Sequence, residues 1–176
     1  MRTLIFNQVW LIQSDSIDQQ VNEVAMMNVG NYCTRDVIIT DTDSSILEVT
    51  KLMRQHHVGS VVIVSRNNDG VRPVGIITDR DIVVEVIAKD VPLDSITIED
   101  VMARSPVIAR EDDDLFTTME MMRLKGIRRI PVVDSLGLLA GILTTDDLLE
   151  IIYEEVGNIV SLVSHEQKRE QKKLVT

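Results

Sequence analysis

A threonine followed three residues later by an aspartate occurs in two matching motifs, Gly75-Ile-Ile-Thr-Asp-Arg-Asp81 and Gly141-Ile-Leu-Thr-Thr-Asp-Asp147. In each motif an apolar run typical of a strand passes into a segment with the apolar spacing of a helix. The motifs begin 66 positions apart, at residues 75 and 141, which suggests two copies of a small domain. We therefore place Thr78 and Thr144 at strand-to-helix junctions, with Asp81 and Asp147 in the first helical turns.

Two kinds of chemistry suit a hydroxyl and a carboxylate at the start of a helix. The threonine oxygen can accept a hydrogen bond from the backbone N–H three residues on, which makes a capping box. Alternatively, the free N–H groups attract an anion, while the hydroxyl and the carboxylate accept hydrogen bonds from ribose hydroxyls. A duplicated domain would repeat either arrangement, so the motifs by themselves leave both interpretations open.

The composition limits the class of protein and its partners. The chain has 176 residues, of which 44% are apolar and only 3% aromatic, so aliphatic side chains and methionine must fill the core. A net charge of −10 and a pI of about 4.7 argue against duplex DNA or an anionic membrane as the main partner. We therefore expect no nucleic-acid partner and no membrane partner.

The single cysteine, Cys33, excludes an intramolecular disulfide and a cysteine-based zinc site, and it fits a reducing cytoplasm. The apolar stretch at residues 3–12 is interrupted by Asn7 and Gln8, and no small-residue cleavage site clearly follows it. This pattern does not favour a signal peptide. We therefore predict a cytoplasmic protein.

The segments around the two motifs repeat one order of elements: strand, helix, strand, turn, returning strand and helix. In the first copy we expect these elements at residues 37–39, 46–53, 61–64, 67–70, 74–77 and 82–87. Ser45 and Glu48 can form a capping box where its first helix begins. In the second copy we expect them at residues 107–108, 115–122, 130–133, 134–137, 138–143 and from 146 onward.

This pattern predicts an α+β protein with four parts. They are an N-terminal arm or extended start (1–28), two similar domains (29–90 and 96–153) and a C-terminal helical extension (154–176). Residues 1–26 lie outside the repeat and precede two methionines, so we expect them to be dispensable for folding. The last helix should run from about Asp146 towards Lys172.

An apolar stripe follows this last helix through Leu148, Leu149, Ile152, Val156, Ile159, Val160 and Val163. Such a helix is too apolar to lie free in water, so it should pack on a second chain or back onto the sheet. No third domain is present to cover the stripe, and we therefore predict a homodimer.

Each unit resembles a CBS domain, the module named after cystathionine β-synthase, and the tandem resembles a Bateman module. The resemblance rests on the two motifs above, on residues 46–53, on Ile127-Arg-Arg-Ile-Pro-Val-Val-Asp134, and on Asp100-Val-Met-Ala103 as an opening segment. It covers about residues 30–152 and is strongest to small stand-alone bacterial CBS-pair proteins with a long final helix. It implies two β-α-β-β-α units packed sheet to sheet, with clefts that bind adenosyl compounds.

The resemblance also implies roles for ten residues. The ribose would be held by Thr78 with Asp81 and by Thr144 with Asp147, which favours ligand binding over capping alone. Apolar side chains beside the short strands would enclose the base, or serve only as core: Ile38, Ile39, Val107 and Ile108. Arg128 and Arg129 would reach the phosphates, or form a solvated basic edge. Their counterparts in the first unit are Gly59 and Ser60, so phosphate binding should be asymmetric.

The predicted function is non-catalytic: a regulatory module that binds AMP, ADP or ATP and acts as an energy or metabolite sensor. The alternative is a ligand-free dimerisation or protein-interaction module that uses the long C-terminal helix. The three histidines have no spacing for a metal or a triad, and the acidic run at 111–114 suits a helix start. We therefore expect no catalytic residues, no metal site and no required cofactor, with a regulated protein as a further candidate partner.

Overall fold

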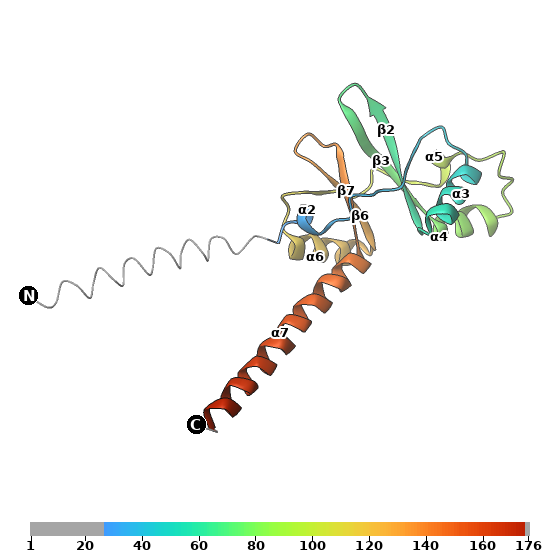
Figure 1. Ribbon diagram of the computed structural model, residues 1–176. Coiled ribbons are helices and arrows are strands. Elements are labelled where there is room, and N and C mark those ends of the chain that lie inside the picture. The colour runs from blue at the N-terminus through green and yellow to red at the C-terminus, as the bar shows by residue number, and fades with distance from the viewer. Residues whose placement is uncertain (1–26, 175–176) are drawn as a thin grey trace, which may run out of the picture.

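The computed structural model describes residues 27–174, with side chains through residue 166, and consists of two α+β units followed by a long helix (Figure 1). The first unit has a four-stranded sheet in the order β1 (Ile39–Asp41), β2 (Ser60–Asn67), β3 (Gly70–Thr78) and β4 (Ala103–Arg104). The second has a three-stranded sheet of β5 (Ala109–Arg110), β6 (Arg129–Val133) and β7 (Leu139–Thr144). The N-terminal arm was predicted at residues 1–28, and residues 1–26 of it lie outside this range, as does the segment on which the interpretation against a signal peptide rests.

The two sheets repeat one topology. The short first strand of each unit pairs in parallel with the next, and the hairpin strands pair antiparallel. The first hairpin turns at Asn67 and Gly70, and the second is closed by Asp134, whose backbone N–H donates to Leu138 O at 2.9 Å. Strands β3 and β7 are in contact where the two sheets meet. The predicted α+β class is therefore confirmed.

Helices α3 (Ile46–His56) and α6 (Leu115–Lys125) cover the sheets of the first and second unit. The expected capping box of Ser45 and Glu48 is present at the start of α3. Asp114 caps α6 by accepting a hydrogen bond from Thr117 N at 2.8 Å, and Gly126 ends α6 in the left-handed region at φ 64°. These local signals fix where each helix begins and ends, because they satisfy backbone groups that lack helical partners.

Two short segments pack on the unit that does not contain them in sequence. Helix α2 (Val29–Tyr32) precedes the first unit, but Val29 is fully buried in the core of the second unit. Conversely, α5 (Ile98–Val101) and β4 lie between the units in sequence and complete the first unit, with Ile98 fully buried in its core. Residues 100–103, expected as the opening of the second unit, therefore pack on the first.

Gly75 and Gly141, which open the repeated motifs, lie where these two short segments pack closely on the strands of the other unit. A Cβ on Gly141 would lie 2.6 Å from the Cys33 Sγ and 2.9 Å from the Thr34 carbonyl oxygen, both in the segment that precedes the first unit. A Cβ on Gly75 would collide with the side chain of Met102, in the segment that follows that unit. A larger residue at position 141 would therefore push the crossing segment away from β7, whereas a larger residue at position 75 would require the Met102 side chain to move.

Helix α4 (Asp79–Ile82) starts after β3 and continues into a π-helical turn, η1 (Val83–Ile87). Helix α7 (Thr145–Leu174) starts after β7, continues through Gly157 and extends away from the body (Figure 1). The predicted long C-terminal helix is thus confirmed. Within residues 27–174, no helix combines the length and the apolar character needed to span a membrane.

Candidate ligand-binding site between the two units

A cavity of about 240 Å³ lies between the two units. Its walls come from three places: the segment before β1, the turn between α3 and β2, and the β6, β7 and α7 region of the second unit. The lining residues are Thr34, Asp36, Val37, Ile38, His57, Val58, Gly59, Ser60, Arg129, Ile142, Thr144, Asp146 and Asp147. A molecule in this cavity would contact both units at once.

The Thr144 and Asp147 pair forms a capping box at the start of α7. Asp147 Oδ2 accepts hydrogen bonds from the backbone N–H and the hydroxyl of Thr144, both at 2.7 Å. The Asp147 N–H in turn donates to Thr144 Oγ1 at 3.2 Å. The other carboxylate oxygen, Oδ1, accepts from the Thr34 hydroxyl at 3.1 Å. One carboxylate oxygen of Asp147 thus caps α7, while the other accepts a hydrogen bond from the segment that lines the cavity.

The equivalent pair in the first unit has the same capping geometry. Asp81 Oδ2 accepts from the Thr78 N–H at 2.9 Å and from its hydroxyl at 2.7 Å, and Asp81 N donates to Thr78 Oγ1. The capping interpretation therefore holds for both motifs. Capping and ligand binding do not compete, because a carboxylate has two oxygens and several acceptor positions. Thr78 and Asp81 lie outside the cavity described above.

The predicted site residues divide into two groups. Ile38, Arg129, Thr144 and Asp147 line the cavity together. The remaining six lie outside its lining: Thr78, Asp81, Ile39, Val107, Ile108 and Arg128. Ile39 pairs with Val62 in the sheet, Val107 packs against the core of the second unit, and Ile108 is exposed.

The two adjacent arginines have different surroundings. Arg129 is half-buried, and its Nη1 donates to the carbonyl oxygen of Gly59 in the other unit at 3.3 Å. A Cβ on Gly59 would lie 3.1 Å from Arg129 Nη2 and 3.3 Å from Asp79 Oδ2. Arg128 is exposed, and its carbonyl oxygen accepts from Thr145 N at 3.0 Å. Only Arg129 therefore brings a guanidinium to the cavity.

The lining contains nine residues that were not predicted from the sequence: Thr34, Asp36, Val37, His57, Val58, Gly59, Ser60, Ile142 and Asp146. Gly59 and Ser60 were expected to supply no phosphate contact, which makes phosphate binding asymmetric, and both line the same cavity as Arg129. Their alignment with Arg128 and Arg129 was the available signal, since equivalent turns of a repeat can face each other across one boundary. Thr34 and Asp36 carry no local pattern that places them here.

The charges of the lining favour a ligand with several hydroxyl donors. Asp36, Asp146 and Asp147 supply carboxylates that accept hydrogen bonds, while Arg129 supplies a fork of donors for an anionic group. Val37, Ile38 and Ile142 provide apolar surface. A small molecule with a sugar, a flat apolar part and an anionic group fits this distribution.

Beside the cavity, Arg35 holds the segment that precedes β1, which we call the exchanged segment, against the second unit. Its guanidinium donates to Gly30 O at 2.6 Å and to Ala140 O at 3.1 Å, and it pairs with Glu111 at 2.5 Å. Burial raises the pKa of the neighbouring Cys33 thiol, which keeps it in its neutral form. These contacts hold Thr34 next to Asp147.

Residues 29–88 and 98–154 each match the family model of the CBS domain. The chain belongs to the CBS domain family. It carries two such domains in tandem, so the resemblance inferred from the repeated motifs is confirmed. An uncharacterized protein of Methanopyrus kandleri is 34% identical over 148 residues, which cover 84% of this chain and 72% of that protein.

Two solved structures are similar to the chain and contain ligands. The CBS domain pair of protein MJ0100, in complex with 5′-methylthioadenosine and S-adenosyl-L-methionine, is 28% identical with a TM-score of 0.64. The match covers 74% of this chain and 98% of that one. A CBS domain protein from Pyrobaculum aerophilum complexed with AMP is also 28% identical, with a TM-score of 0.62 over 69% of this chain and 89% of that one.

Proposed function

We propose that this tandem CBS protein is a non-catalytic regulatory module that binds an adenine nucleotide such as AMP, ADP or ATP between its two units. The observation that carries the proposal is the cavity itself, which combines Thr144, Asp147, Ile38 and Arg129. The similar CBS structures with AMP or with adenosyl compounds support the ligand class. Because the ligand would touch both units, it would shift any equilibrium in which the units move relative to each other.

Each part of the nucleotide has a matching group in the cavity. Asp147 Oδ1, together with the Thr34 hydroxyl that it holds, would take the ribose hydroxyls. Val37, Ile38 and Ile142 would flank the base, and Arg129 would contact the phosphate. The repeat also motivates a second, equivalent site at Thr78 and Asp81. Its base would lie near Ile39, Val107 and Ile108, with Arg128 towards the phosphate.

The proposal is tested by calorimetry with adenosine, AMP, ADP and ATP, after mass spectrometry of small molecules released from the denatured protein. Asp147→Asn nearly keeps the shape of the side chain but removes its charge. A charge-assisted hydrogen bond contributes about 1.5–3 kcal/mol, so AMP affinity should fall about tenfold or more. We expect the same variant to leave the fold cooperative.

Asp100→Asn is the matched control for this experiment. Asp100 accepts hydrogen bonds from the backbone N–H and the hydroxyl of Thr97 at the start of α5, just as Asp147 does from Thr144 at the start of α7, but Asp100 lies outside the cavity. Both carboxylates hold the third helical position of a capping box, so both variants change the caps alike. If both leave AMP affinity unchanged, or if none of the four ligands binds below about millimolar concentration, the nucleotide proposal is wrong.

A second candidate function, protein interaction through α7, has its own supporting observation. Along this helix Leu149, Tyr153, Ile159 and Leu162 are each more than 60% exposed, although they are large and apolar. Such a surface marks an interaction site in a protein of this size. We propose that it forms a homodimer, with or without nucleotide, in a cytoplasmic protein that also contacts a regulated protein partner.

A further inference from the structure

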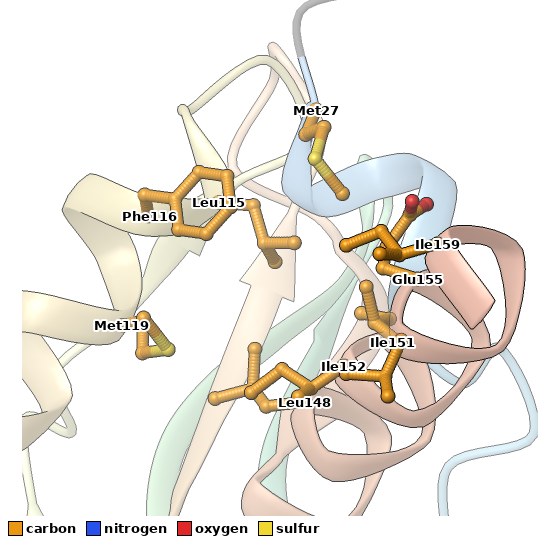
Figure 2. Close-up of a pocket in the computed structure, with 10 residues that line it drawn as sticks. Met27, Leu115, Phe116, Met119, Leu148, Ile151, Ile152, Glu155 and Ile159 are labelled. Carbon is orange, nitrogen blue, oxygen red and sulfur yellow. The ribbon is translucent and has the colours of Figure 1, made fainter. Parts of the chain in front are cut away.

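A groove of about 160 Å³ runs beside the first half of α7 (Figure 2). One wall is formed by Met27, Phe116 and Met119, and the other by Ile152, Val156 and Ile159 of α7. Nine of its ten lining residues are apolar, and the tenth is Glu155. The groove is as long as about three turns of helix, because its α7 residues run from 148 to 159. Its shape and apolar lining suit the apolar face of another helix.

The exposed apolar residues of α7 follow the spacing of a two-helix seam. Leu149, Ile152, Val156, Ile159 and Val163 are separated by three, four, three and four positions, and each is between 46% and 63% exposed. This alternation is the heptad pattern that packs one helix against another. The seam includes the α7 side of the groove and continues past it at Val163. A single partner helix could therefore cover both the groove and the seam.

The charge of α7 changes sign along its length. Between residues 145 and 155 the sequence has two aspartates and three glutamates and no lysine or arginine. Between residues 165 and 174 it has three lysines and one arginine with two glutamates. Two such helices side by side in parallel would place like charges together at both ends. An antiparallel pair places the acidic half of each helix beside the basic half of the other.

The position of the groove favours the same orientation. It lies at the base of α7, next to α6, whereas the second half of α7 extends beyond the body (Figure 1). An antiparallel partner would lay its extended second half in the groove, where it has room. A parallel partner would bring the base of its own helix, together with its own body, to the same place.

We propose that two copies of this chain associate through α7 in antiparallel orientation, with the second half of each helix in the groove of the other copy. The heptad pattern allows several registers, and this dimer takes one that places the second half of each helix in the groove. Val156 lies opposite the partner's Ile159, and Ile152 lies opposite the partner's Val163, so that facing residue numbers add to 315. This dimer refines the second candidate function and does not depend on nucleotide binding in the cavity between the units.

The oligomeric state is the first test. Light scattering of the full chain at micromolar concentration should give twice the chain mass of 19.8 kDa. Ile159→Glu, which puts a charge at the centre of the seam, should give the single-chain mass with an unchanged circular dichroism spectrum. Leu136→Glu is the matched control, since Leu136 is also large and 68% exposed but lies in the β6–β7 turn, and it should stay dimeric. A monomeric full chain overturns the proposal.

Disulfide cross-linking tests the orientation, in a Cys33→Ala background that removes the native thiol. Facing residues in the antiparallel register can form a disulfide, which needs Cα atoms within about 7 Å. A mixture of Ile152→Cys and Val163→Cys chains should therefore cross-link. Either variant alone should not, because its two cysteines would lie about 16 Å apart along the helices, at a rise of about 1.5 Å per residue.

The opposite pattern, in which each variant cross-links alone and the mixture gives no mixed product, would mean a parallel pair and overturn the proposal. Residues 1–26 are the other candidate occupant, because the chain enters the described structure at Met27, on the wall of the groove. A monomeric full chain that becomes dimeric when residues 1–26 are removed would assign the groove to that segment instead. Calorimetry of AMP with the monomeric Ile159→Glu variant separates this question from nucleotide binding, since its cavity is intact.

Discussion

Arg129, at the start of β6 in the second unit, donates a hydrogen bond from Nη1 to the carbonyl oxygen of Gly59 in the first unit, 3.3 Å away. At the equivalent position of the first unit stands Ser60, a buried residue without charge. At this pair of equivalent positions, therefore, only the second unit supplies a guanidinium that reaches the other unit. An anionic group of a ligand would be bound asymmetrically, by the cavity that Arg129 lines.

Arg129→Ala should weaken the binding of AMP by about tenfold or more and leave adenosine affinity within about twofold. The reason is that a guanidinium contact with phosphate is a charge-assisted hydrogen bond, which adenosine cannot make. Arg123→Ala is the control, because Arg123 of α6 is exposed and lies outside the cavity, and it should change neither affinity. Calorimetry with both ligands decides the matter. Equal losses for AMP and adenosine in Arg129→Ala would contradict a phosphate contact.

Gly59→Ala should reduce AMP affinity several-fold while the protein stays folded. The added Cβ would lie 3.1 Å from Arg129 Nη2, so the guanidinium must shift by a few tenths of an ångström. The end of an arginine side chain can make this shift at little cost in stability. Gly157→Ala is a control at a site where the added Cβ meets nothing within 4 Å, and it should leave affinity unchanged. An unchanged AMP affinity in Gly59→Ala would show that Arg129 does not need its observed position.

Gly157→Ala should also raise the melting temperature, because alanine stabilises a helix interior by about 0.5–1 kcal/mol relative to glycine. The helix passes through Gly157 without a break. Thermal unfolding monitored by circular dichroism measures the change. A lower melting temperature would indicate that a small residue is needed at this position of α7, for example by a close contact in the dimer.

The local parts of the fold could be predicted from the sequence, because their signals lie within a few residues. The capping boxes at Ser45 and Thr78, the helix end at Gly126 and the two hairpins all follow from nearby residue types. The repeated motif singled out Asp147 in the same way, whereas Arg129 was selected through the resemblance to the CBS family, and both line the cavity. Local patterns suffice where a side chain acts on its own turn of backbone.

The exchange of short segments between the units could not be predicted in this way. Thr34 reaches Asp147 only because its backbone pairs with Ile142 of the second unit, through two hydrogen bonds of 2.9 Å. This pairing joins residues more than a hundred positions apart, so no periodicity of the sequence reports it. The one local trace is the glycine that opens each motif, Gly75 or Gly141, where a crossing segment comes too close for a side chain.

Val29→Ala tests whether the exchanged segment contributes to the core of the second unit. Val29 is fully buried, and the N–H of Leu115 donates to the carbonyl oxygen of Met27 at 2.7 Å. Removing buried methyl groups should lower the free energy of unfolding by about 1–3 kcal/mol. Urea unfolding of a chain that starts at Met27 measures the effect. That chain without the substitution should keep the cooperative transition of the full chain.

The control for this loss of stability is Val83→Ala. Val83 lies in η1 and is 53% exposed, so this variant should change the free energy of unfolding by less than about 0.5 kcal/mol. Equal stability of the Val29→Ala and Val83→Ala chains would contradict the packing described here. Loss of the cooperative transition on removal of residues 1–26 would show instead that these residues are needed for folding.

Three capping carboxylates predict how stability depends on pH. Hydrogen bonds from the backbone N–H and hydroxyl of Ser45 hold the pKa of Glu48 below its usual 4.5. In the same way, Thr97 lowers the pKa of Asp100, and Thr117 lowers the pKa of Asp114, from the usual 3.8. A carboxyl group with a lowered pKa in the folded state stabilises the protein above its unfolded pKa. This contribution is lost as the pH falls through the folded pKa.

These groups should therefore leave the melting temperature nearly constant above about pH 5. They should lower it as the pH falls to about 4 and below. Asp114→Asn should fall less steeply over this range, because asparagine caps a helix about as well as aspartate but does not titrate. The two melting curves should differ most near neutral pH, where the charge of Asp114 also favours the positive end of α6, and converge near pH 2. Circular dichroism melts at half-unit pH steps measure both curves. Parallel curves down to pH 2 would mean that the hydrogen bonds of Asp114 to Thr117 do not favour its charged form.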